Sequence, residues 1–275
     1  RAKCPTAPPG LRGIVRSMRP TLLLLLAACG GDPAPGEGGG ADSADDAETS
    51  GGAGSGGSGD DTGDDTGDDT GDDTGGADLP DTDHCGVLDD WTPVYTRTVE
   101  AWAAQDDLAA GPDAPLVFVG SSSIRRWEDL ARSYRDHRPV QRGFGGAQAG
   151  DVAWFADDLV NRHDPRGVVV FAGTNDVAFG VDPDTVVARF RCLRERVWAA
   201  HGRDLPVFFI GITPTPSRWS GWDAADAVNA AVAALAEDDP GLVYVDVPSA
   251  FLETGAPPDS DLFVSDQLHL SASGY

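Results

Sequence analysis

Three serines stand in a row directly after an apolar stretch of the chain. Residues 116–119 read Leu-Val-Phe-Val, and Gly120 then leads into Ser121, Ser122 and Ser123. A serine hydroxyl becomes an effective nucleophile only when a neighbouring base takes its proton. A serine between a strand and the following helix also lies at a helix N-terminus, where free backbone N–H groups favour developing negative charge. The stretch therefore suggests nucleophilic catalysis by one of these serines.

The base and its orienting group could come from the end of the sequence. Residues 265–269 read Ser-Asp-Gln-Leu-His, which puts Asp266 three positions before His269. Histidine is the usual base for a serine, and a carboxylate on its second nitrogen fixes the tautomer. Positions three apart share a face in a helical turn, so we expect Asp266 to hold His269 locally.

Two further segments offer donors for the oxyanion of a tetrahedral intermediate. Residues 143–146 read Gly-Phe-Gly-Gly, and residues 173–176 read Gly-Thr-Asn-Asp. Gly146 can present its N–H with no side chain in the way, and Asn175 can offer its amide. The backbone N–H of the nucleophile would be the third donor. This chemistry requires no cofactor and no metal.

Alternating strands and helices must bring these segments together. We expect strands over 116–119, 140–144, 168–172, 207–212 and 242–247, and helices over 91–108, 125–134, 151–162, 183–201 and 224–237. Strands that are apolar on both faces and joined by helices indicate a parallel sheet covered on both sides. We therefore predict an α/β fold, a three-layer α/β/α sandwich with a doubly wound, flavodoxin-like sheet. Its ligand crevice lies beyond the carboxyl ends of the strands.

The order of these motifs resembles that of the SGNH hydrolases, the GDSL esterase/lipase superfamily. The resemblance runs from about residue 91 to residue 275 and is greatest for the branch that reads Gly-Ser-Ser-Ser-Ile-Arg after its first strand. It implies that Ser122 is the nucleophile and that Ser121 stands where the family usually has Asp. We expect Ser123 to cap a helix that begins near Arg125.

The same resemblance implies roles for the other motif residues. Ser122, Gly146 and Asn175 would form the oxyanion hole, and Asp266 and His269 would complete the triad. Residues 214–219, Pro-Thr-Pro-Ser-Arg-Trp, also resemble this branch, but no catalytic role follows for them.

The function implied is a serine esterase that hydrolyses carboxylic esters through an acyl-enzyme. Short-chain esters, O-acetylated carbohydrates and lysophospholipids are the substrate classes in view, with small esters or acetylated polysaccharide favoured. The alternative is a surface-anchored glycan-binding module that has lost turnover, and the intact set of motif residues argues against it. The sequence ends six residues after His269, where the family normally continues through a closing helix. Either the sequence is a fragment, or the domain leaves one face of its sheet partly uncovered.

The first 29 residues resemble a bacterial lipoprotein signal. Met18 and Arg19 precede the leucines of 22–26, and Ala-Ala-Cys follows, ending at Cys29. The apolar run is too short to span a bilayer, so we expect lipid on Cys29 to anchor the protein to a membrane of the bacterial cell envelope, facing the periplasm or the surface. A leucine-rich helix with an incidental cysteine is the alternative.

Residues 30–84 carry 17 acidic residues and no Lys or Arg, and they repeat Gly-Asp-Asp-Thr over 59–74. Such a segment buries too little apolar surface to fold, so we predict a disordered tether. Calcium binding is the alternative, but the spacing of the Asp residues does not match a calcium-binding loop.

Residues 85–275 form the expected hydrolase domain, with 28 acidic and 15 basic residues. A domain this acidic lacks the basic patch that nucleic acids require, so we expect no nucleic-acid partner. Cys85 and Cys192 remain as a pair in an exported protein, where disulfides persist. A disulfide between them and two separate buried thiols both remain open.

Overall fold

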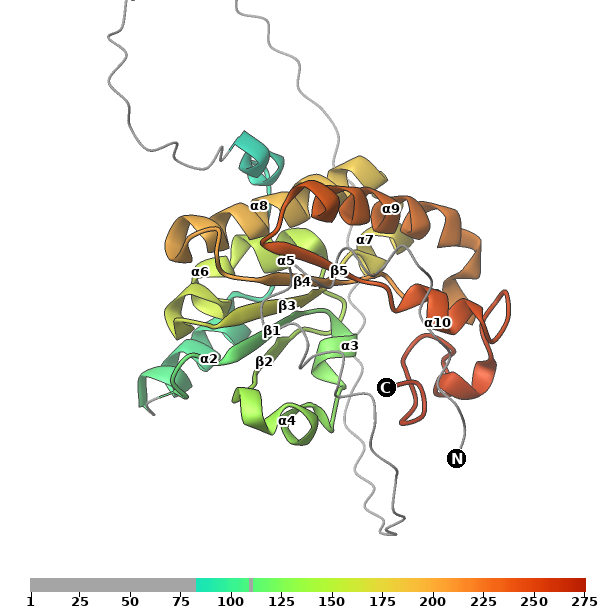
Figure 1. Cartoon of the computed structure of the whole chain (residues 1–275), viewed down its shortest axis with the longest axis horizontal. Coiled ribbons are helices and arrows are strands. Elements are labelled where there is room, and N and C mark those ends of the chain that lie inside the picture. Colours follow the sequence, from blue (N-terminus) through green and yellow to red (C-terminus); the bar gives the residue numbers. More distant parts are fainter. Residues whose placement is uncertain (1–82, 109–110) are drawn as a thin grey trace, which may run out of the picture. The chain divides into compact units, whose positions relative to one another are not determined.

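The computed structural model of the chain describes residues 83–108 and 111–275 (Figure 1). The strands in this part form one five-stranded sheet in the order β2-β1-β3-β4-β5. Every neighbouring pair is parallel. The strands are β1 (Leu116–Gly120), β2 (Val140–Gly143), β3 (Gly167–Phe171), β4 (Val207–Ile210) and β5 (Leu242–Val245). The predicted α/β fold with a doubly wound parallel sheet is confirmed.

The strand order reverses between β1 and β3. The chain starts at β1, moves outward to β2, and then returns to the other side of β1 to form β3, β4 and β5 in turn. A crevice opens at the carboxyl ends of the strands where the winding direction changes. The segments that follow β1 and β3 therefore border the expected ligand site.

Nine α-helices and five short 3-10 segments connect the strands within the described residues. The α-helices are α2 (Thr96–Leu108), α3 (Ser122–Arg125), α4 (Leu130–Ser133), α5 (Ala149–Trp154), α6 (Ala156–Leu159), α7 (Thr174–Ala178), α8 (Pro183–His201), α9 (Trp222–Asp238) and α10 (Pro248–Leu252). The 3-10 segments are η1 (Asp83–Leu88), η2 (Arg135–His137), η3 (Asn161–His163), η4 (Pro216–Gly221) and η5 (Ser260–Leu262). None of the helices within 83–108 and 111–275 is both long and apolar enough to cross a bilayer.

Alternate residues of the strands face two separate sets of side chains. On one face, Val117 and Val119 of β1 join an extended core with Val152 of α5 and Leu193 of α8. On the other face, the ring of Phe118 lies 6.0 Å from that of Trp127 and 4.9 Å from that of Tyr134, centroid to centroid. Both faces of the sheet are thus covered, which makes three layers; α8 and α9 lie side by side in Figure 1.

Three of the predicted helices are wrong in extent. The helix predicted over 125–134 is divided into α3 and α4, and η2 follows. The side-chain amide of Gln141 on β2 donates to the carbonyls of Ile124 and Trp127, at and just after the end of α3. The helix predicted over 151–162 is divided into α5, α6 and η3. At the end of α5, Arg196 of α8 donates to the carbonyls of Ala153 and Trp154.

The helix predicted over 91–108 begins only at Thr96. Pro93 disfavours helical conformation in the residue before it, so the chain turns there first. The ring of Trp91 is instead covered by the guanidinium of Arg189, 4.6 Å from the ring centroid.

A disulfide joins Cys85 of η1 to Cys192 of α8, across 107 residues of sequence. The sequence allowed either a disulfide or two separate buried thiols, and the structure contains the disulfide. The segment η1 begins at Asp83, inside the expected tether. The predicted signal segment, Cys29 and residues 30–82 of the tether lie outside the described residues.

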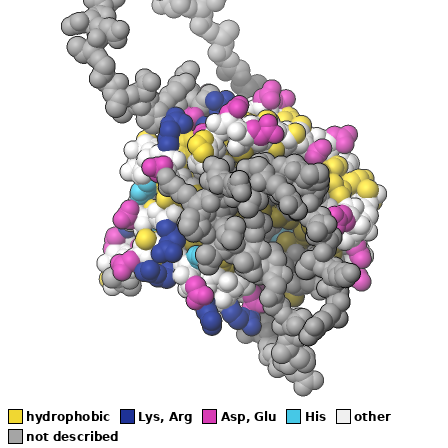
Figure 2. Space-filling model, in the orientation of Figure 1, with side chains coloured by type: hydrophobic (Ala, Val, Ile, Leu, Met, Phe, Trp, Pro, Cys, Tyr) yellow, Lys and Arg dark blue, Asp and Glu magenta, His cyan; other side chains and the backbone are white. Residues whose placement is uncertain are grey.

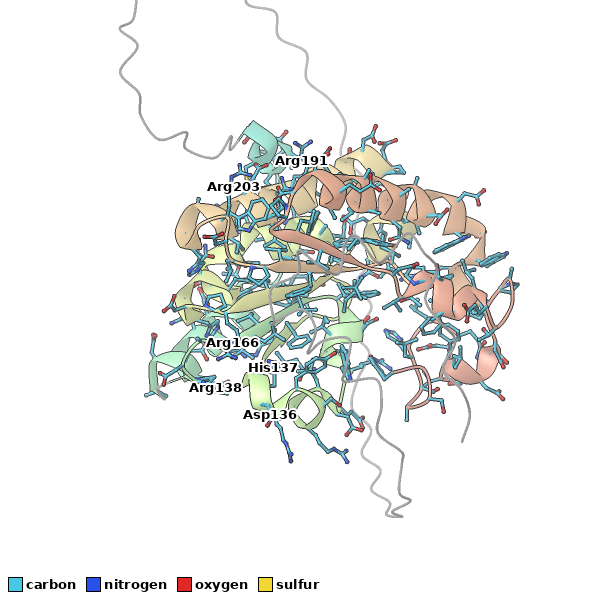
Figure 3. All side chains as sticks on the ribbon, viewed as in Figure 1. Asp136, His137, Arg138, Arg166, Arg191 and Arg203 are labelled. Atoms are coloured by element: carbon cyan, nitrogen blue, oxygen red, sulfur yellow. A yellow bond between two sulfur atoms is a disulfide. The ribbon has the colours of Figure 1, made fainter. Side chains whose placement is uncertain are left out.

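Figure 2 shows both magenta Asp and Glu groups and dark blue groups of basic residues on the visible surface of the described part. In Figure 3, Arg138 and Arg166 mark the segments just before β2 and β3, at the amino ends of these strands. The predicted catalytic residues Ser122 and Asn175 lie after the opposite, carboxyl ends of their strands.

Candidate active site

The turn after β1 brings Ser122 to the carboxyl edge of the sheet. The backbone N–H of Ser121 donates to the carbonyl of Phe171 at the end of β3, over 3.0 Å. Gly120 has φ +145°, and a Cβ on it would lie 2.0 Å from that same carbonyl oxygen. Only glycine permits this close approach of the two strand ends.

The helix α3 begins at Ser122, not near Arg125, so the predicted cap by Ser123 is wrong. Ser121 occupies the N-cap position, and its side chain makes no capping hydrogen bond. The hydroxyl of Ser121 is buried without a hydrogen-bond partner among the described residues. Ser122 is therefore the first helical residue, and its side chain is free to face the site.

Ser122 and His269 are in hydrogen-bond contact. Nε2 of His269 lies 2.8 Å from Oγ of Ser122, and Nδ1 of His269 lies 2.7 Å from Oδ2 of Asp266. The structure thus brings together the three residues predicted for the triad. In this arrangement the imidazole can take the hydroxyl proton of Ser122 while the carboxylate stabilises the resulting charge.

Asp266 and His269 meet in a tight turn, not in the helical turn that their spacing suggested. The N–H of Gln267 donates to the carbonyl of Val264, and Gln267 has φ +55°. A bridge between Phe263 and Leu270 closes the turn at its base. The pairing of Asp266 with His269 is therefore set by loop geometry.

The carboxylate of Asp266 is held ionised by this turn. Partial burial opposes ionisation, but hydrogen bonds from the His269 side chain and from the N–H groups of His269 and Leu268 outweigh it. Together they lower the pKa of Asp266 to about 2. At neutral pH, the Asp266 carboxylate can therefore accept a hydrogen bond from Nδ1–H of His269 and orient the ring.

Asn175 lies in α7, the helix that follows β3, and both Nδ2 and Oδ1 of its side chain form hydrogen bonds. Its Nδ2 donates to the carbonyl of Ala147 over 2.8 Å, and its Oδ1 accepts from Nη1 of Arg218 over 2.9 Å. An amide nitrogen carries two protons, so one N–H of Asn175 remains for a ligand. Among the described residues, the backbone N–H groups of Ser122 and Gly146 also have no hydrogen-bond partner.

The buried carboxylate of Asp176 in α7 contacts both the segment after β2 and α8. The carboxylate of Asp176 accepts from the N–H of Ala149 over 2.9 Å and from Arg189 over 2.8 Å. Burial raises the pKa of Asp176, and these hydrogen bonds work against that effect. The hydrogen bond from Ala149 to Asp176 holds the segment that follows Gly146 beside α7, which carries Asn175. Neither Asp176 nor Arg189 was predicted to have a role. The sequence feature that could have indicated one for Asp176 is its position directly after Asn175.

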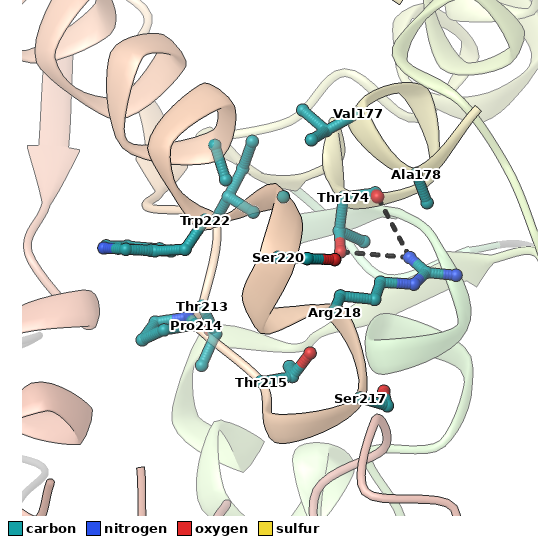
Figure 4. A pocket seen from close by; sticks show the side chains of 13 residues that line it. Thr174, Val177, Ala178, Thr213, Pro214, Thr215, Ser217, Arg218, Ser220 and Trp222 are labelled. Atoms are coloured by element: carbon teal, nitrogen blue, oxygen red, sulfur yellow. Dashed lines mark hydrogen bonds between the residues drawn. The ribbon is translucent and has the colours of Figure 1, made fainter. Parts of the chain in front are cut away.

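Two cavities adjoin at this edge of the sheet. The first, of about 110 Å³, contains Ser122 and His269 in its lining and is otherwise mostly apolar, with side chains that include Trp127, Phe171 and Phe251. The second, of about 310 Å³, has a mixed lining of Ser and Thr hydroxyl groups, Arg218 and apolar side chains that include Val177, Ile212 and Trp222 (Figure 4). The two cavities share four lining residues: Thr174, Thr213, Thr215 and Arg218.

A serine hydroxyl hydrogen-bonded to an imidazole, at the strand ends of a doubly wound sheet, is the arrangement expected of a serine-dependent hydrolase, and the protein is an esterase-type enzyme of that class. The chain belongs to the GDSL-like lipase/acylhydrolase family, whose model matches residues 106–275. The resemblance to SGNH hydrolases seen in the sequence is thereby confirmed. No curated protein shows significant sequence similarity to the chain.

Solved structures with the same fold come from several bacteria. A protein provisionally described as a platelet activating factor from Streptococcus pneumonia has a TM-score of 0.57 and 17% identity, covering 69% of this chain and 92% of its own. A GDSL-like lipase from Bacteroides thetaiotaomicron has a TM-score of 0.55 and 20% identity, with coverages of 64% and 91%. A protein provisionally described as an acylhydrolase from Bacteroides fragilis has a TM-score of 0.55 and 21% identity, with coverages of 64% and 89%. At these identities the likeness concerns the fold alone.

Proposed function

We propose that the protein hydrolyses carboxylic esters through an acyl-enzyme formed on Ser122. The observation that carries the proposal is the continuous chain of hydrogen bonds from Ser122 through His269 to Asp266. His269 takes the hydroxyl proton as Oγ attacks the ester carbonyl, and then gives it to the departing alcohol. Water repeats the sequence on the acyl-enzyme and releases the acid.

The oxyanion of each tetrahedral intermediate is bound by three donors in this proposal. They are the backbone N–H groups of Ser122 and Gly146 and the remaining side-chain N–H of Asn175. Their support is that these groups have no other partner among the described residues and belong to segments that meet at the strand ends. Donors fixed in advance stabilise the developing charge without reorganisation.

The apolar cavity beside Ser122 is proposed as the acyl site, with a preference for short acyl chains. Its volume of about 110 Å³ leaves room for only a few heavy atoms, and its lining includes Trp127, Phe171 and Phe251. The larger, polar cavity next to it is proposed as the site for the alcohol part of the ester. Hydroxyl groups and Arg218 line it beside apolar side chains that include Trp222, which suits the sugar ring of an acetylated carbohydrate.

A fluorophosphonate probe tests the proposed nucleophile directly. Wild-type protein and the Ser123→Ala variant should be labelled, and the Ser122→Ala variant should not. Turnover of esters that differ only in acyl length should then fall as the chain grows beyond a few carbons. Wild-type protein that is neither labelled nor active on any ester in the series would instead favour a binding module.

We also propose that lipid on Cys29 anchors the enzyme in the bacterial cell envelope, with residues 30–82 as an acidic tether. The support is the sequence pattern alone: a short basic stretch, an apolar run and Ala-Ala-Cys, followed by a Gly/Asp-rich segment. In this arrangement the hydrolase domain would act on esters near the membrane without being embedded in it.

A further inference from the structure

The guanidinium of Arg218 makes a set of contacts that the proposed mechanism does not yet use. Arg218 lies in η4, within the segment 214–219 that had no assigned role. Its Nη1 lies 2.9 Å from the carbonyl oxygen of Thr174, 3.1 Å from Oγ1 of Thr174 and 2.9 Å from Oδ1 of Asn175. Figure 4 shows the side chain extended from η4 toward Thr174 at the start of α7.

Arg218 also lacks a counter-charge. Within residues 83–108 and 111–275, none of the carboxylates forms an ion pair with it, although many other arginines there are paired. Partial burial lowers the pKa of Arg218, and no neighbouring charge offsets that effect. The guanidinium nevertheless remains protonated at neutral pH, as arginine does in proteins. Within the described residues, the charge is therefore stabilised by the dipoles of uncharged oxygens, one of which belongs to Asn175.

The orientation of the Asn175 side-chain amide is set by this contact together with the contact to Ala147. A guanidinium has only donors, so it can face Oδ1 but not Nδ2 of the amide. The carbonyl of Ala147 is only an acceptor, so it can face Nδ2 but not Oδ1. The two partners together exclude the flipped amide, and the free N–H of Asn175 has a fixed direction. A cation on Oδ1 also polarises the amide, because hydrogen bonds in series strengthen one another.

We infer that Arg218 is a positioning residue for the oxyanion hole, acting through Asn175 on the negative charge of the transition state. The inference rests on the proposed esterase function. An interaction that matters only when the oxyanion forms lowers kcat on removal and leaves KM nearly unchanged. Binding of an anionic group on the substrate by Arg218 would have the opposite signature, a rise in KM confined to charged esters.

The test is a double-mutant cycle between Arg218→Met and Asn175→Ala, measured on a neutral short-chain ester and on an anionic ester of equal acyl length. Arg218→Met should lower kcat roughly 10-fold or more on both esters, which is less than the roughly 10²- to 10³-fold expected for removing a direct oxyanion donor. KM should change by less than about twofold. In the Asn175→Ala background, Arg218→Met should have little further effect, because its influence passes through the missing amide.

Two further variants separate positioning from folding. Arg218→Lys keeps the charge but loses the planar guanidinium, so it should recover part of kcat. Arg196→Met is the matched control, since Arg196 also donates to two carbonyls, those of Ala153 and Trp154, but in the α5–α8 contact. It should leave kcat unchanged even where thermal stability falls. A loss of kcat in Arg196→Met equal to that in Arg218→Met would mean that stability explains both, and would overturn the inference.

Two other outcomes would also overturn it. One is a rise in KM for the anionic ester alone with kcat unchanged, which would make Arg218 a substrate-binding residue. The other is a loss of kcat in the double variant equal to the product of the two single-variant losses, which would mean that Arg218 does not act through Asn175. Failure of the proposed function is distinguishable, because it would appear as undiminished ester hydrolysis by Ser122→Ala.

Discussion

Oγ of Ser122 and Nε2 of His269 lie 2.8 Å apart, although 147 residues separate them in the chain. The first follows β1, an inner strand of the sheet, and the second lies on a turn near the end of the sequence. The chain between them contributes β3, β4 and β5, so the folded sheet is what brings the last segment back beside the end of β1. A defect in any of these strands should therefore affect activity as well as stability.

Replacing Ser122 with Ala should abolish ester hydrolysis with little change in stability. Loss of a triad residue typically costs on the order of 10³-fold or more in kcat. Ser123→Ala is the matched control, since Ser123 is the next residue of α3 and its carbonyl, not its side chain, accepts from the Tyr275 hydroxyl. Initial rates of ester hydrolysis and thermal unfolding of both variants test this prediction. An active Ser122→Ala with an inactive Ser123→Ala would shift the nucleophile by one position.

Replacing Asn175 with Ala should lower kcat by roughly 10²- to 10³-fold and change KM little, as loss of one oxyanion donor does. The side chain is 4% exposed and also donates to Ala147, so a loss of stability is expected as well. Steady-state kinetics should therefore be measured well below the melting temperature. A large rise in KM at constant kcat would assign Asn175 to substrate binding.

The apolar strands and the catalytic motifs are the features that could be predicted from sequence. A strand buried on both faces has a continuous apolar pattern, and a motif that follows such a strand must lie at the carboxyl edge of the sheet. That reasoning placed Ser122 and Asn175 at one edge, where the structure has them. The pairing of Asp266 with His269 was also predicted, although the turn that creates it was not.

The features that could not be predicted depend on contacts between distant side chains and backbone. Gln141 and Arg196 donate from other elements to carbonyls near the ends of two short helices, α3 and α5. Arg218 and Asp176 support the loops around Asn175 through similar long-range hydrogen bonds. Local periodicity contains no information about such contacts, so the helix ends and the supporting residues had to come from the structure.

Breaking the disulfide should lower the free energy of unfolding. The bond between Cys85 and Cys192 closes a loop of 107 residues, and bonds of this kind typically contribute about 2–4 kcal/mol. The measurement is denaturant unfolding of wild type with and without reductant, beside a Cys85→Ser/Cys192→Ser double variant. Reductant should destabilise the wild type and have no effect on the double variant. Equal stability of all three would contradict the prediction.

Replacing Cys29 with Ser should release the protein from the membrane. The apolar run of 22–26 is too short to span a bilayer, and an acidic tether has no affinity for anionic lipid. Acyl chains contribute about 0.8 kcal/mol per buried methylene, and more than one chain is needed for stable attachment. Cell fractionation with labelled palmitate compares wild type and variant. Equal membrane retention without label would show that something other than lipid on Cys29 holds the protein.

Asp151 should make the folded protein less stable as the pH rises from about 4 to about 6. Its side chain accepts from the N–H of Gln148, but burial raises the pKa of Asp151 to about 6, and the nearby Asp176 carboxylate adds to this shift. The unfolded chain releases this proton near the ordinary pKa of 3.8, so between the two values the folded state binds more protons and loses stability with rising pH.

The change Asp151→Asn isolates this effect, because an asparagine oxygen can still accept from the N–H of Gln148. Above pH 6 the variant should be more stable than wild type, by up to roughly 3 kcal/mol, and the difference should shrink toward zero near pH 4. Asp223→Asn, at an exposed carboxyl in the first turn of α9, is the matched control. Denaturant unfolding at pH 4, 5, 6 and 7 gives the difference in free energy of unfolding between variant and wild type at each pH. A wild type that is more stable than Asp151→Asn at pH 7 would mean that ionised Asp151 stabilises the loop before α5, and that burial does not dominate its titration.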